Sequence, residues 1–143
     1  MSLAENLSGT TWELVSFQSE DKKGNMIYPM GEDATGFIYI HPGNRLSVHI
    51  MVADREKSRK RVGEVDFNTE AEKEMAELGY HAYTGPFTLN EDAVTLTTHV
   101  EVSLITSYIG VDQTRTVKLE GDTMQLSNVK HPERKLVWKK VEN

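Results

Sequence analysis

The stretch that decides the fold is Arg45-Leu46-Ser47-Val48-His49-Ile50-Met51-Val52, in which two kinds of position alternate strictly. Every second residue is aliphatic, and the residues between them are mostly polar. A period of two predicts a half-buried β-strand with one face in a core. The turn residues His41-Pro42-Gly43-Asn44 stand before it and follow a β-rich run from Phe37 to Ile40, so we predict a hairpin here.

Further runs along the chain also have the composition of strands: residues 9–17, 83–89, 94–104, 114–119, 124–127 and 135–141. Short connectors at Asn90-Glu91-Asp92 and Glu120-Gly121-Asp122 indicate antiparallel hairpins. The total is about eight strands, a number that closes into an up-and-down barrel whose interior suits side chains or one small ligand. We therefore predict an all-β antiparallel barrel, although an open sandwich accepts the same strands.

One short helix is expected between the third and fourth strands, from Asn68 to Leu78. Thr69 followed by Glu72 resembles a capping box, and Gly79 supplies a stop. Ala71, Met75 and Leu78 share one helical face. This face either packs the helix against the barrel or makes the helix a lid over one mouth.

The composition predicts a single domain spanning residues 1–143, without repeats or linkers. The absence of cysteine excludes disulfides, thiolate metal sites and a cysteine nucleophile. A net charge of −6 opposes general binding to nucleic acid or to anionic membranes. The first seven residues lack the basic and apolar segments of a secretory signal, so a cytoplasmic location is expected.

The segment from Asp54 to Arg61 is an exception to the acidic balance, because five of its eight residues are basic. It has neither an aromatic stacking partner nor an apolar helical stripe beside it. A charge run of this kind is typical of a solvated loop at a barrel rim. A docking patch for another protein is the alternative.

Seven short blocks occur in an order that resembles the bacterial and fungal lipocalin-like domain proteins. They are Leu7 with Gly9-Thr10-Thr11-Trp12 and Leu14-Val15-Ser16, then residues 36–39, 80–85, 99–104, 113–115 and 119–122, and finally Trp138. The resemblance implies a calycin barrel with Gly9 and Trp12 at its closed base. It implies little about activity, since the superfamily includes carriers and some enzymes. Two residues separate Gly9 from Trp12, and Lys139 and Lys140 stand where an arginine often covers the tryptophan.

Arg115 is the first candidate for a functional residue. Its neighbours Thr114, Thr116, Lys118 and Glu120 form a fully polar strand face that must meet water, so Arg115 is expected to point inward. A buried guanidinium is costly without a partner, and its rigid fork of donors suits a carboxylate or phosphate. Two interpretations are open: an internal ion pair, for instance with Glu101, or a site for an acidic or polar head group.

Other candidate ligand contacts are Gln113, Tyr83, His99, Tyr39 and His49. Gln113 shares the inward strand face with Arg115, and Tyr83 offers both an apolar ring and a hydroxyl. Alternation alone places His99 outside the barrel, whereas the family resemblance favours an inward position. Trp12 is assigned to structure.

The leading hypothesis is the binding of a small, largely apolar ligand with an acidic or polar head inside the barrel. The alternatives are a cofactor-free enzyme of the isomerase or cyclase type, with His99 or Tyr83 as acid or base, and a protein-interaction module that uses the basic segment. The five histidines show no metal-ligand spacing, and no nucleophile elbow or phosphate loop occurs. We therefore expect no metal and no cofactor.

Overall fold

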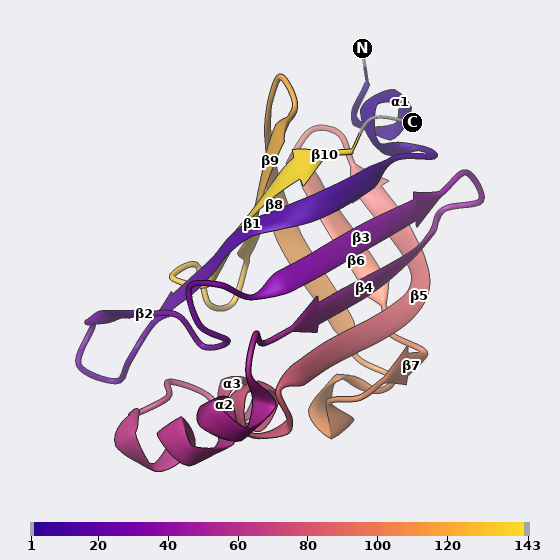
Figure 1. The fold of residues 1–143 in the computed structure, drawn as a ribbon. Helices are drawn as coiled ribbons and strands as arrows, with labels where there is room; N and C mark the ends of the chain where they lie inside the picture. The colour runs from indigo at the N-terminus through magenta and orange to yellow at the C-terminus, as the bar shows by residue number, and fades with distance from the viewer. Residues whose placement is uncertain (1, 142–143) are drawn as a thin grey trace.

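Eight long antiparallel strands close into a barrel in the computed structural model, which describes residues 2–141 (Figure 1). In sequence they are β1 (Thr11–Glu20), β3 (Thr35–His41), β4 (Arg45–Met51), β5 (Tyr80–Asn90), β6 (Thr95–His99), β8 (Asp112–Glu120), β9 (Thr123–Asn128) and β10 (Lys135–Lys140). Each strand pairs with its neighbour, and β10 pairs back onto β1 with Trp138 opposite Leu14. This last pairing confirms the predicted closed barrel and excludes the open sandwich.

The strand that decided the prediction is confirmed as β4. Leu46, Val48 and Ile50 are buried, whereas His49 and Met51 are exposed. The turn before it places His41 opposite Arg45, and Asn44 adopts a positive φ of 59°, which asparagine tolerates. The two-residue strands β2 (Met26–Ile27) and β7 (Val102–Ser103) add to β1 and β5.

The region between β4 and β5 contains two α-helices instead of the single one expected. Helix α3 (Glu70–Leu78) confirms the prediction: the Thr69 hydroxyl accepts from the Glu72 amide, and Gly79 ends the helix with φ 72°. Helix α2 (Arg55–Arg61) is followed by the 3-10 turn η1 (Val62–Glu64) and occupies the basic segment.

The prediction of a loop for the basic segment was therefore wrong. Arginine, glutamate and lysine are good helix formers. Asp54 caps α2 by accepting from the Lys57 amide. The Ser58 hydroxyl also donates to the Ala76 carbonyl oxygen at 2.7 Å, which fixes α2 against α3.

The strand expected from Val94 to Leu104 is interrupted. Val94 adopts a positive φ of 54°, β6 ends at His99, and the chain resumes pairing only at β7. At this interruption the His99 carbonyl oxygen lies so close to Gly85 in β5 that there is no room for a Cβ at that position.

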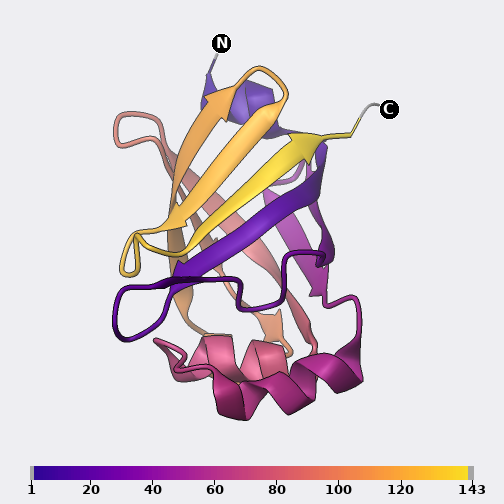
Figure 2. The ribbon, with the colours of Figure 1, turned by 60° about the vertical axis from the view of Figure 1, so that its left-hand side comes forward.

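The two ends of the barrel are covered differently, as Figures 1 and 2 show. At one end, helix α1 (Leu3–Leu7) buries Leu3 and Leu7 in the same apolar cluster as Trp12. Trp12 is 2% exposed and donates to the Thr10 hydroxyl at 2.8 Å, whereas Lys139 and Lys140 are exposed. At the other end, α2 and α3 lie below the strands. Among residues 2–141, no helix is long and apolar enough to cross a membrane.

Replacing Gly85 with alanine should destabilise the barrel by about 2 kcal/mol or more, because the new Cβ would need room that the backbone occupies. It would lie 1.9 Å from the His99 carbonyl oxygen. Gly43→Ala is the matched control, since its Cβ would meet nothing within 4 Å. Urea unfolding measures both variants, and equal stabilities would contradict the close approach.

Candidate functional site

Arg115 points into the barrel, as the alternation of β8 predicted. Arg115 and Val117 are buried, whereas Thr116 and Lys118 between and beyond them are exposed. Only 6% of Arg115 is exposed. In the sheet it stands opposite Leu96 of β6 and Asn128 of β9. Its position on the inward face of β8 therefore shields the guanidinium from water.

Arg115 has no anionic partner among residues 2–141. Its Nη1 donates to the Gln113 side-chain oxygen at 3.2 Å and more weakly to the Thr114 carbonyl oxygen at 3.4 Å. Both acceptors are neutral. Glu101 instead pairs with Arg45 on the exposed surface, so the interpretation of Arg115 as half of an internal ion pair with Glu101 was wrong.

Three rings form a cluster beside Arg115. The ring centroid of His81 lies 5.3 Å from that of Tyr83 and 5.2 Å from that of Tyr108, and the two tyrosines are 5.7 Å apart. His81 is 4% exposed, and its Nδ1 has no hydrogen-bond partner in the described chain. Nδ1 of His81 is therefore a buried polar atom that is still able to form a hydrogen bond.

Burial shifts the pKa values of two groups in this cluster, His81 and Tyr83. Burial, reinforced by the positive charges of Arg115 and Arg134, lowers the pKa of His81 to about 3. Burial also raises the pKa of the Tyr83 phenol, against the opposing pull of Arg115. At neutral pH both side chains are therefore neutral hydrogen-bonding groups.

A second buried arginine, Arg134, is fully paired. Its Nη2 lies 2.8 Å from Oε2 of Glu72 in α3, and both side chains are almost completely buried. Arg134 also donates to the hydroxyls of Tyr108 and Thr69, each at 3.1 Å. One carboxylate thus neutralises one of the two guanidiniums, and the positive charge of Arg115 is left unmatched.

Two hollows meet at this cluster. The inner one is a cavity of about 20 Å³ inside the barrel, lined by residues that include Arg115, His81, Tyr83 and Trp138. The outer one is an open pocket of about 300 Å³ at the barrel mouth. Tyr108 and Arg134 line both, so the hydrogen bond between them stands at their common wall.

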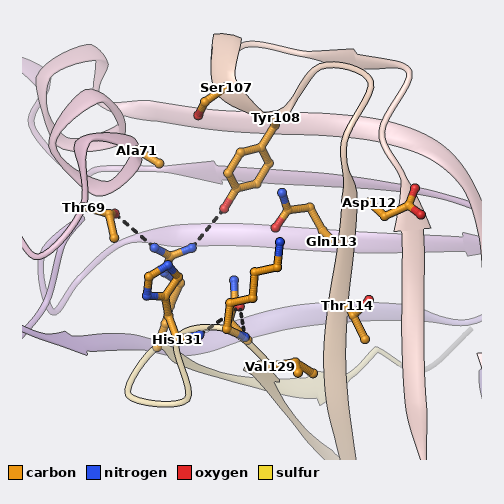
Figure 3. Close-up of a pocket in the computed structure, with 12 residues that line it drawn as sticks. Thr69, Ala71, Ser107, Tyr108, Asp112, Gln113, Thr114, Val129 and His131 are labelled. Atoms are coloured by element: carbon orange, nitrogen blue, oxygen red, sulfur yellow. Dashed lines mark hydrogen bonds between the residues drawn. The ribbon is translucent and has the colours of Figure 1, made fainter.

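Figure 3 shows the outer pocket, which we call the mouth pocket. Tyr108 reaches into it from the 3-10 turn η2 (Thr106–Tyr108). Thr69, at the start of α3, and Tyr108 both accept hydrogen bonds from Arg134 there. Gln113 also points into the pocket. Because Gln113 accepts from Arg115, it connects the mouth pocket to the buried guanidinium.

The sequence candidates fall into two groups. Arg115 and Tyr83 line the inner cavity, and Gln113 lines the mouth pocket. His99, Tyr39 and His49 are exposed and line neither hollow. The expectation that placed these three at a ligand inside the barrel does not agree with their positions.

Their outward positions have local causes. His99 lies on the polar face of β6 that alternation indicated, and its Nδ1 is 2.8 Å from Asp112 on the neighbouring strand. Tyr39 and His49 form a row of outer-face rings with Tyr80, with centroids 6.4 and 6.2 Å apart. Such cross-strand pairs stabilise a sheet from outside.

Three residues of the site were missed: His81, Tyr108 and Arg134. His81 had a usable signal, because it stands two residues before Tyr83 and therefore on the same strand face. Tyr108 lies in a short 3-10 turn and Arg134 in the turn before β10, where no periodicity indicates direction. In the described chain, no group of three histidine, aspartate or glutamate side chains is placed to hold a metal ion.

An eight-stranded antiparallel barrel that is closed by apolar packing at one end and has a pocket at the other end is a barrel of the calycin class. The family model of the lipocalin-like domain matches residues 9–141, and the chain belongs to this family. No curated protein matches the chain.

Glu72→Gln should lower the free energy of unfolding by about 3 kcal/mol, because it leaves the buried Arg134 without its carboxylate. Glu77→Gln, on the exposed side of the same helix, should change stability by no more than about 0.5 kcal/mol. Urea unfolding compares the two. A Glu72 variant as stable as the control would mean that the pair contributes nothing to folding.

His81 should make the fold lose stability as the pH falls below 6.5. Between this ordinary pKa and the folded value of about 3, the unfolded chain binds a proton that the folded chain does not. The slope is about 1.4 kcal/mol per pH unit. His81→Gln removes this contribution, so between pH 7.5 and pH 4.5 it should lose about 3 kcal/mol less than the wild type. Exposed His41→Gln should follow the wild-type profile.

Proposed function

We propose that this protein binds a small ligand with an acidic head group, directed at Arg115, and holds the rest of the ligand in the mouth pocket. The observation that carries the proposal is the buried guanidinium of Arg115, which has no anion beside it among residues 2–141. A buried charge without a partner costs several kcal/mol, roughly, and an anionic ligand would remove this cost.

The size of the two hollows supports the placement of the ligand. Small-molecule pockets usually occupy about 300–1,000 Å³. The mouth pocket, at about 300 Å³, reaches this range, whereas the inner cavity of about 20 Å³ is too small for an apolar chain or ring. The apolar part of the ligand is therefore assigned to the mouth pocket, where Ala71, Val129 and the ring of Tyr108 provide contacts.

The family assignment supports the same class of function. Lipocalin-like barrels typically bind small hydrophobic ligands. The isomerase or cyclase alternative gains no such support, because His99 lies outside the barrel. A general base works best with a pKa near the operating pH, and burial moves the pKa of both His81 and Tyr83 away from neutrality.

The test is a calorimetric titration with octanoate and phenylacetate, and with the two corresponding neutral amides. Wild-type protein should bind the acids and not the amides, and Arg115→Met should lose at least about tenfold in affinity, since a charged hydrogen bond is removed. Exposed Arg59→Met is the matched control and should bind like the wild type.

The stability of the same variant separates a ligand role from a structural one. Methionine replaces an unmatched buried cation with an apolar chain, so Arg115→Met should be as stable as the wild type or more stable. A strongly destabilised variant, or acids that bind both forms equally well, would contradict the proposal.

A further inference from the structure

We propose that the inner cavity is the seat of one carboxylate, with Arg115 and His81 as the two side chains that hold its oxygens. This inference rests on the proposed function and makes it more specific, because it defines the head group and adds His81 as a specificity-determining residue. It also predicts that larger or doubly charged heads, such as phosphate, are rejected.

Two of the five buried side-chain atoms that lack a hydrogen-bond partner among residues 2–141 belong to residues that line this cavity. Nδ1 of His81 and Nε1 of Trp138 are buried without a partner, and both residues line the cavity together with Arg115. Most buried polar atoms in proteins are satisfied, and an unsatisfied one costs about 1–3 kcal/mol. Trp12, in contrast, is satisfied, since its indole N–H donates to the Thr10 hydroxyl at 2.8 Å.

The charges around the cavity define the charge of the ligand. Arg115 and Arg134 are the cations that line it. Glu72 neutralises Arg134 at 2.8 Å, so one positive charge is left over. The neighbouring side chains of His81 and Tyr83 add no charge at neutral pH, because burial lowers the pKa of His81 and raises that of Tyr83. A monoanion completes this balance, whereas a phosphate would bring up to two negative charges.

The volume of the cavity defines the size of the head group. About 20 Å³ is little more than the room that one water molecule needs, which is about 10–15 Å³ on this scale. A planar carboxylate is the smallest organic anion that offers two acceptor oxygens. A tetrahedral phosphate would have to displace the packed rings.

His81 can serve as a donor without charging the site. Its Nδ1 is unpartnered, and a neutral imidazole donates from one nitrogen. Because burial holds the pKa of His81 at about 3, the ring is neutral before a ligand arrives. Arg115 then supplies the positive charge, and His81 donates a hydrogen bond that orients the second carboxylate oxygen.

The rest of the bound ligand extends from the inner cavity into the mouth pocket, through the wall that the two share. This wall contains Tyr108 and Arg134, whose hydrogen bond measures 3.1 Å. Tyr108 is carried by the three-residue turn η2 and not by a barrel strand. A displacement of this ring opens the cavity to the mouth pocket without breaking any strand pairing.

The first experiment is NMR of wild-type protein with ¹⁵N-labelled histidine and tryptophan, titrated with octanoate or octyl phosphate. Octanoate should shift the ring nitrogen signals of His81 and the indole signal of Trp138. The indole signal of Trp12, which is already bonded to Thr10, should stay in place. Octyl phosphate should bind at least tenfold more weakly and leave these signals unchanged.

The second experiment removes the proposed donor but keeps a ring. His81→Phe should weaken octanoate binding at least tenfold with Arg115 intact, because a hydrogen bond to a charged group is lost. His49→Phe, in the row of outer-face rings, is the matched control and should leave affinity unchanged. The NMR titration uses wild-type protein and tests the proposal even where the His81 variant does not fold.

The outcomes distinguish this inference from the proposed function. Wild-type protein that binds no carboxylic acid would overturn both. Binding that Arg115→Met abolishes, but that accepts octyl phosphate equally well or shifts only His131 at the mouth pocket, would overturn the carboxylate seat alone. Shifts at His81 and Trp138 with octanoate, and loss of affinity in His81→Phe, support it.

Discussion

The ion pair between Glu72 and Arg134 is the interaction on which the open end of this barrel depends. It joins α3, which precedes β5, to the turn before β10, so residues 62 positions apart in the chain are fixed together at the mouth. The same guanidinium holds the Tyr108 hydroxyl. The position of the wall between the two hollows therefore follows from this pair.

The pair also determines what the interior lacks. Because Glu72 is committed to Arg134, Arg115 is left with two neutral acceptors. Natural proteins often give up stability at sites that must bind something. The unsatisfied atoms of His81 and Trp138 beside the same cavity fit this pattern, since the opposite end of the barrel pairs the indole of Trp12 within the chain.

The barrel and the inward direction of Arg115 could be predicted because both follow from local alternation. The polar face from Thr114 to Glu120 fixed the direction of Arg115, and the alternation in β6 also described His99 correctly where the family resemblance did not. Tyr39 and His49 were misplaced because an aromatic ring suits a pocket or the outer face of a sheet equally well.

The rest of the site depends on contacts between distant segments. No local pattern indicates that Glu72 meets Arg134 or that Tyr108 enters the mouth pocket from a 3-10 turn. Helix α2 was missed because a charge run is usually solvated loop, whereas its helicity depends on the Asp54 cap and on the contact of Ser58 with α3.

Closure of the barrel has a consequence for synthesis on the ribosome. The first long strand, β1, is made more than a hundred residues before its partner β10, and the Val141 amide still donates to the Thr11 carbonyl oxygen at 2.8 Å. Contacts between such distant segments are slow to form. Until β10 is synthesised, the edge of β1 that pairs with it has no partner within the chain, and an unpaired strand edge is a site for pairing with other chains.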